Sequence, residues 1–414
     1  MPTTIRTSDV REVLALVPFQ LGFQPTESAV LVGLRGPRSQ VGLVARVDLG
    51  RLAAPGDEGH TARSLVGHLV ADGARRAVAI VYTAADLQRW GQDGGDLGAT
   101  DDPERHDDDA GPGPAARAAV RALSSAALDA LGELETWVVG PRGYFALGCP
   151  DPRCCPPGGR PLEELQSTVV GAQMVLDGVV VAATRDGLVR LPETTPAQRK
   201  AARRAADRWR ARGAAAAPGS PSHRWRRDGL ALWRHALDAA LAPPARRDDA
   251  GAAPGVLGGG PVLGDAAELP EATATGRLLA ALEDVLVRDA VLISFVEGND
   301  RVADRLVAGE TGPAIGRALA SITDPVRGRR PDPRRARAAR TVLEHAVAHA
   351  TRGRHAPALT LLAVIAWWEG DGARAGLLVD RALAADPTHR LALLLDQALS
   401  AGMPPGWARA DQAC

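Results

Sequence analysis

The sequence predicts an α/β domain with a mixed sheet, followed by an all-helical C-terminal half that ends in a tetratricopeptide-like hairpin. Up to residue 159, short apolar or alternating segments typical of strands are interleaved with segments of helical periodicity. Beyond that point the apolar residues recur at helical spacing. Because 414 residues with 45% apolar content can bury more than one core, we expect an α/β domain over 1–159 and a helical region over 160–414.

The first predicted elements are a short helix and a hairpin. Ser8 or Asp9 caps the helix, and Pro18 ends it because proline cannot continue a helix. Residues 29–34 are apolar, and residues 41–49 alternate between the two sides as a half-buried strand does. The turn signals between these two strands predict that they pair as a hairpin.

The next predicted elements are a helix, an inner strand and a loop. Residues 61–72 place their apolar side chains on one helical face, and residues 77–82 form the continuous apolar run expected of an inner strand. Residues 91–114 are rich in glycine, proline and aspartate. Their few apolar side chains cannot offset the entropy lost on ordering, so we expect a mobile acidic loop.

A helix over 115–131 and strands over 135–139 and 144–147 complete the predicted α/β domain. The remaining segments with helical periodicity are 162–176, 195–212, 224–241, 272–287 and 289–296. Residues 356–402 then show the spacing of one tetratricopeptide repeat and a capping helix. A single repeat packs against its neighbours and does not make a peptide-binding superhelix.

Three of the four cysteines lie within seven residues, at Cys149, Cys154 and Cys155. We favour the interpretation that they are small buried side chains in a proline-rich loop. A zinc site is the first alternative, with a fourth ligand from elsewhere, although adjacent ligands strain tetrahedral geometry and the paired CxxC spacing is absent. The second is a disulfide from Cys149 to Cys154 or Cys155.

Arg46 and Asp48 are the weak candidates for catalytic residues, since they lie two apart on one face of the second predicted strand. Together with the cysteine run they could frame an anion or metal site, as in a metal-dependent hydrolase. A solvated pair is the simpler interpretation. The chain has no P-loop and no strand-linked GxGxxG, so we predict no nucleotide cofactor.

Two further patterns are weaker. Glu344, His345 and His349 place two imidazoles one helical turn apart, but their order is not HExxH, and we expect an exposed polar face. Nucleic-acid binding would draw on two arginine-rich faces. These are Arg199, Arg203, Arg204, Arg208, Arg210 and Arg212, and Arg327, Arg329, Arg330, Arg334, Arg335, Arg337 and Arg340. Few aromatic side chains interleave them, which argues against this function.

Several segments together resemble an uncharacterised family common in actinobacteria, domain of unknown function 4192. The matching segments are 9–18, 21–25, 28–34, 46–49, Cys154-Cys155-Pro156 and 382–387. They are spread over almost the whole chain. The resemblance implies no activity, ligand or mechanism.

From the sequence we therefore predict a cytoplasmic, non-catalytic interaction or regulatory protein. No complete catalytic constellation is visible, and a helical end-piece suits a protein partner. The N-terminus has no secretory pattern, no apolar stretch reaches membrane length, and a net charge of zero favours neither nucleic acid nor a membrane as partner. An enzyme with its site near Arg46, Asp48 and the cysteine run is the alternative hypothesis, and a nucleic-acid-associated protein is the second alternative.

Overall fold

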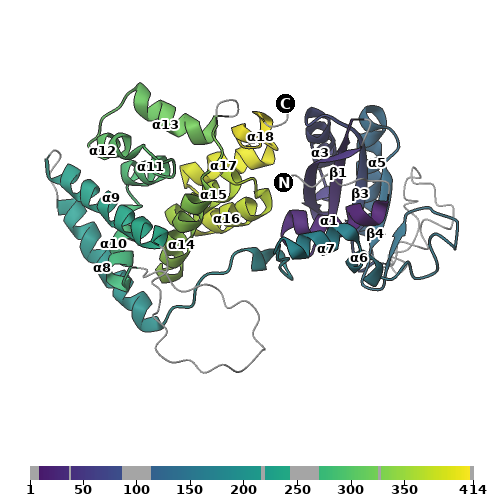
Figure 1. The fold of residues 1–414 in the computed structure, drawn as a ribbon, viewed down its shortest axis with the longest axis horizontal. Coiled ribbons are helices and arrows are strands. Elements are labelled where there is room, and N and C mark those ends of the chain that lie inside the picture. Colours follow the sequence, from purple (N-terminus) through teal and green to yellow (C-terminus); the bar gives the residue numbers. More distant parts are fainter. Residues whose placement is uncertain are drawn as a thin grey trace. The chain divides into compact units, whose positions relative to one another are not determined.

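The structure is a computed structural model that describes residues 9–36, 39–85, 113–215, 220–242, 270–324 and 328–410. The chain divides into two compact units, Met1–Leu188 and Val189–Cys414, and each is described here by itself (Figure 1). Residues 160–188 belong to the first unit, although their sequence predicts that they are part of the helical region. Most of the expected acidic loop, residues 91–112, lies outside the described residues.

The first unit is built on a five-stranded sheet with the order β2-β1-β3-β4-β5. The strands are β1 (Ser28–Arg35), β2 (Gln40–Asp48), β3 (Ala74–Tyr82), β4 (Glu135–Val139) and β5 (Tyr144–Ala146). β1 is antiparallel to both β2 and β3, β3 is parallel to β4, and β4 is antiparallel to β5. The sheet is therefore mixed, and the predicted hairpin is confirmed as β1 and β2.

One face of this sheet packs against α2 (Leu49–Leu52), α3 (His60–Ala71) and α5 (Pro114–Leu131). The core on this side includes Leu31, Ala79 and Val81 from the sheet and Leu69 and Leu123 from the helices. In β1 and β3 the neighbouring residues Val30, Val32 and Ile80 point to the opposite face because side chains alternate along a strand.

The opposite face of the sheet is covered as well. Val30, Val32 and Ile80 are fully buried there, and α1 (Val10–Leu21) lies over this face (Figure 1). α1 packs in turn against α6 (Glu163–Gln166) and α7 (Val169–Leu176). The Glu12 carboxylate accepts hydrogen bonds from the backbone N–H groups of Val169 and Val170, at the start of α7. This packing explains why residues after 159 belong to the first unit.

The expectation that Pro18 ends the first helix is wrong. α1 continues through Pro18 to Leu21 and ends at Gly22, whose φ of 76° is the left-handed conformation favoured by glycine. Proline removes one backbone hydrogen bond from a helix. Here Val13, Leu14, Leu16, Val17 and Leu21 are buried on α1, and this burial holds the last turn in place.

The second unit contains only helices in its described residues. They are α8 (Pro196–Ala215), α9 (Ser220–Leu241), α10 (Ala272–Ala281), α11 (Val285–Ile293), α12 (Asp300–Val307), α13 (Pro313–Thr323), α14 (Pro333–His349), α15 (Ala356–Trp368), α16 (Gly372–Ala385), α17 (Arg390–Ser400) and α18 (Gly406–Ala410). The predicted helix over 272–287 is divided, because Asp284 caps α11 by accepting hydrogen bonds from the N–H groups of Leu286 and Val287.

α15 is buried on all sides and forms the centre of the C-terminal part, where it packs against α14 and α16. Residues 369–371 join α15 to α16, so a helix pair lies where the repeat-like spacing predicts one. Among the described residues, no helix combines the length and the apolar character that spanning a bilayer requires.

Candidate functional site

Arg46 and Asp48 lie on β2 at one edge of the sheet and form an ion pair, with 2.5 Å between Arg46 Nη2 and Asp48 Oδ1. The Arg46 guanidinium also lies over the Phe23 ring, 5.8 Å from its centroid. The Asp48 side chain is 59% exposed. The two candidate catalytic residues thus bind one another, with Asp48 exposed and the Arg46 side chain only 15% exposed.

Cys149, Cys154 and Cys155, the cysteine cluster, follow β5 at the other edge of the sheet. Four strand-to-strand intervals of about 4.8 Å separate β2 from β5, which makes about 19 Å. Cys155 belongs to the core on the α5 side, whereas Arg46 and Phe23 contact one another on the α1 side. The structure therefore does not bring Arg46, Asp48 and the cysteines into one cleft.

The cysteine cluster itself is compact. Its three Sγ atoms lie within 4.8 Å of one another, and those of Cys154 and Cys155 are 3.8 Å apart. The Asp151 carbonyl accepts hydrogen bonds from the N–H groups of Cys154 and Cys155, at 3.1 and 2.8 Å. Cys155 is 2% exposed, and burial raises the pKa of its thiol to about 12. The predicted burial is complete for Cys155 only, because Cys149 and Cys154 are half-buried.

A pocket of about 670 Å³, which we call the first-unit pocket, opens where β3 and β4 end. These strands are the parallel pair of the sheet, and the carboxyl ends of parallel strands are where α/β sheets most often bind ligands. Most of the lining side chains are apolar: Leu14, Ala15, Pro18, Phe19, Pro25, Ala84, Val139, Pro141, Leu162, Leu165, Val175 and Val181.

Glu27 and Thr83 form a fixed polar group in the wall of the first-unit pocket. The Glu27 carboxylate accepts a hydrogen bond from Thr83 Oγ1 at 3.1 Å and one from the Ala84 N–H at 2.8 Å. Glu27 has a φ of 38°, in the left-handed region that is costly for a residue with a Cβ. Such strain persists only where the surroundings hold it, and it is common at binding sites.

Tyr82 is the other polar group of interest in the first-unit pocket. It is 3% exposed and lines the pocket. A buried tyrosine hydroxyl usually has a partner. Burial raises the pKa of Tyr82 above its ordinary value, so the group is a neutral donor near pH 7. Apart from the position of Thr83 directly after a predicted inner strand, no sequence pattern indicated this site.

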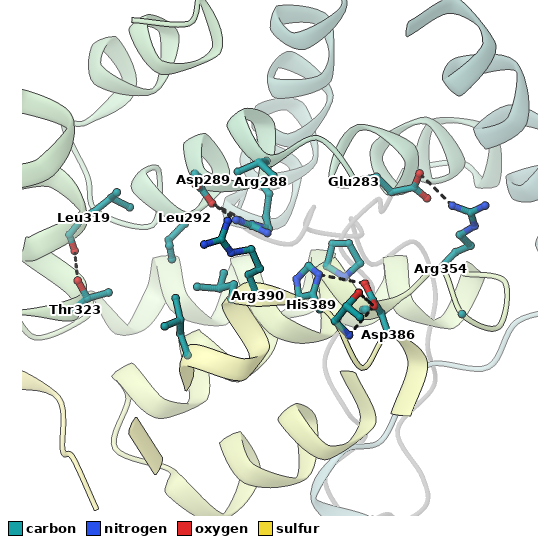
Figure 2. A pocket seen from close by; sticks show the side chains of 17 residues that line it. Glu283, Arg288, Asp289, Leu292, Leu319, Thr323, Arg354, Asp386, His389 and Arg390 are labelled. Carbon is teal, nitrogen blue, oxygen red and sulfur yellow. Dashed lines mark hydrogen bonds and ion pairs between the residues drawn. The ribbon is translucent and has the colours of Figure 1, made fainter. Parts of the chain in front are cut away.

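A second pocket of about 670 Å³, the second-unit pocket, lies among α11, α17 and the segments around Arg354 and Asp386 (Figure 2). Its charges are mostly paired: Arg288 binds Asp289 at 2.8 Å, and Arg354 lies 3.8 Å from Glu283. The His389 ring, drawn near Asp386 in Figure 2, is 3.8 Å from that carboxylate. Its Nε2 atom is buried and has no hydrogen-bond partner among the described residues.

Lowering the pH from about 7.5 to about 5.5 will destabilise the second unit through His389. Burial, and then the charge of Arg288, lower the pKa of His389, while Asp386 and Asp289 oppose this shift. The unfolded chain therefore binds more protons just below pH 6.5, and the free energy of unfolding falls there with falling pH. Urea unfolding at both pH values should show that the free energy of unfolding falls less between pH 7.5 and pH 5.5 in His389→Asn than in the parent chain.

That comparison between variants is needed because other groups also titrate in this unit. Burial lowers the pKa of His345 and raises the pKa values of Glu344 and Asp371. The two carboxyl groups act in the opposite direction to the histidines, and the variant leaves all three unchanged. An equal loss of stability in both proteins would contradict the role of His389.

The expectation of an exposed face at Glu344, His345 and His349 is wrong. His349 is 2% exposed, and Glu344 forms an ion pair with Arg374. His345 Nε2 donates to the Pro270 carbonyl, and His349 Nδ1 donates to the His345 carbonyl. These side chains are occupied by contacts within the second unit.

The arginine face of α8 is exposed at Arg203, Arg204 and Arg208, whereas Arg210 binds Glu283 and Asp207. Nucleic-acid binding through this face stays an untested hypothesis.

A family model described as "Domain of unknown function (DUF4192)" matches residues 11–320 and 328–406. Neither the curated proteins nor the solved structures contain a match to this chain.

Proposed function

The chain belongs to the domain of unknown function 4192 family. Because membership of this family implies no reaction, we propose from the geometry of the structure that the chain is a non-catalytic binding protein. The first unit takes up a small molecule with an apolar body and one polar end. The observation that carries this proposal is the first-unit pocket, an apolar cavity of about 670 Å³ at the carboxyl ends of two parallel strands. Cavities of this size and lining are typical of small-molecule sites.

The polar groups of the pocket support the amphipathic character of the ligand. Tyr82 lines the pocket, and its neutral hydroxyl can form a hydrogen bond with a ligand oxygen or nitrogen. Glu27 is held by Thr83 and Ala84 and shapes the wall beside it. A ligand polar group near Tyr82, with its remainder against Leu14, Phe19 and Val139, fits this distribution.

The same geometry supports binding over catalysis. The Glu27 carboxylate, an acid or base by type, already accepts hydrogen bonds from Thr83 and Ala84. Arg46, Asp48 and the cysteine cluster do not line the first-unit pocket. The enzyme hypothesis requires these residues to converge on one cleft, so it has less support.

A regulatory role would act through α7. Gly171 and Val175 of α7 line the pocket, and Val169 and Leu176 of the same helix are about four-fifths exposed, at 78% and 80%. Exposed apolar side chains of this kind are typical of contacts with a protein partner. We therefore keep a cytoplasmic interaction or regulatory protein as the proposal, with the α15 and α16 pair as its tetratricopeptide-like hairpin.

Filling the mouth of the first-unit pocket will abolish ligand uptake. Gln166 lines the pocket and is exposed, so Gln166→Trp adds an indole there without changing the core. We expect the variant to bind the amphipathic probe 1-anilinonaphthalene-8-sulfonate at least about tenfold more weakly than the parent chain, measured by fluorescence titration.

Gln173→Trp is the matched control, since Gln173 is exposed on α7 but does not line the pocket. It should bind the probe as the parent does. Equal binding by all three proteins would mean that the probe uses the surface, and it would contradict the proposal. Native mass spectrometry of the parent chain adds a second readout: a ligand recovered chemically unchanged supports binding, and a converted one supports an enzyme.

A further inference from the structure

We propose that Cys149, Cys154 and Cys155 hold one zinc ion through their three thiolates, with water in the fourth position. This site is separate from the first-unit pocket and does not depend on the proposed binding function. The proposal rests on the geometry of the sulfur atoms and of the backbone around them.

The sulfur positions match a tetrahedral zinc site. With zinc–sulfur distances of about 2.3 Å, two thiolates of a tetrahedron lie about 3.8 Å apart. Cys154 Sγ and Cys155 Sγ are 3.8 Å apart, although these residues are adjacent in the chain. All three Sγ atoms lie within 4.8 Å of one another, so a shift of at most about 1 Å would complete the three-sulfur face.

The backbone already holds the loop in the conformation that this site needs. The Asp151 carbonyl accepts from both the Cys154 and the Cys155 N–H groups, which fixes the two adjacent residues on one turn. The Ala146 N–H donates to Cys155 Sγ at 3.3 Å. Donors of this kind orient ligating sulfur and stabilise its negative charge.

Packing alone does not explain the convergence. Cys155 is part of the core, but Cys149 and Cys154 are half-buried and still lie against it. A disulfide would join two of the sulfurs and leave the third beside them. A shared metal ion would bind all three sulfur atoms. It would join Cys149, in the segment after β5, to Cys154 and Cys155 in the turn at 151–155.

The test is the metal content of the full chain, purified under reducing conditions without chelator. Elemental analysis should find about one zinc ion per chain. Cys149→Ser and Cys154→Ser should each lower zinc affinity at least about tenfold, as measured by competition with a chromogenic chelator. The fourth cysteine gives the matched control, since Cys414→Ser should keep the full zinc content.

Both test positions are half-buried, and circular dichroism will show whether each variant is folded. Cobalt(II) substitution gives an independent readout, because thiolate-to-cobalt charge-transfer absorption should appear in the parent chain and weaken in each of the two variants. A parent chain that binds neither ion when reduced, or one whose zinc content is unchanged in Cys149→Ser and Cys154→Ser, would overturn the proposal. Recovery of an intramolecular disulfide that leaves a single reactive thiol in residues 149–155 would do so as well.

Discussion

Replacing Gly276 with alanine will destabilise the second unit by about 2–3 kcal/mol, although the same change usually stabilises a helix. Gly276 is buried on α10 where this helix crosses α8. A Cβ at this position would lie 2.0 Å from the Ala202 carbonyl oxygen and within 2.8 Å of two more backbone atoms of Ala202. Because these atoms belong to a helix backbone, the clash can be relieved only by moving α8 and α10 apart.

Gly316→Ala is the matched control for this prediction. Gly316 lies on α13, and a Cβ there would meet no atom within 4 Å. The control should therefore stabilise the unit by about 0.5–1 kcal/mol, the ordinary gain for removing glycine from a helix. In calorimetry the two variants should shift the melting temperature in opposite directions, by about 5–10 °C downward for Gly276→Ala. Shifts of the same sign would refute the close approach of α8 and α10.

The order of strands and helices could be read from the sequence wherever periodicity was strong. The alternation in 41–49 placed β2, and the continuous apolar run at 77–82 placed the inner part of β3. Local rules failed where tertiary packing outweighed them. Pro18 lies inside α1 because the apolar face of that helix is buried on the sheet, and no local pattern reports such burial.

The candidate sites were less predictable than the fold. Tyr82, Val139 and Val175 line one pocket although they are far apart in the chain, and nothing local to any of them indicates a binding site. For the cysteine cluster the sequence shows three candidate ligands but also raises an objection, that adjacent residues strain a tetrahedral site. In the structure the turn at Asp151 places the Sγ atoms of Cys154 and Cys155 3.8 Å apart, which is the spacing that the proposed zinc site requires.

The two units also differ in where their cores lie, and this bears on how the chain unfolds. The core between the sheet and α5 contains residues of the first unit only. Gly276 and Ala202 both belong to the second unit. Since each unit buries its own apolar side chains, a substitution in one core should change the stability of that unit and leave the other unfolding transition in place.

Replacing Leu123 with alanine is the sharpest test of that argument in the first unit, with an expected loss of about 2–5 kcal/mol. Leu123 is 1% exposed on α5, in the core formed with α3 and the sheet, so truncation leaves a cavity that the surrounding strands and helices cannot fill.

Leu128→Ala, on the same helix, is the control: Leu128 is 63% exposed, and its truncation should change stability by no more than about 0.5 kcal/mol. In urea unfolding monitored by circular dichroism, Leu123→Ala should move the first-unit transition to lower urea concentration. The second-unit transition, which Gly276→Ala shifts, should stay at its position in the parent chain. Equal effects of the two leucine substitutions would place α5 outside the core, and a joint shift of both transitions would show that the units unfold as one.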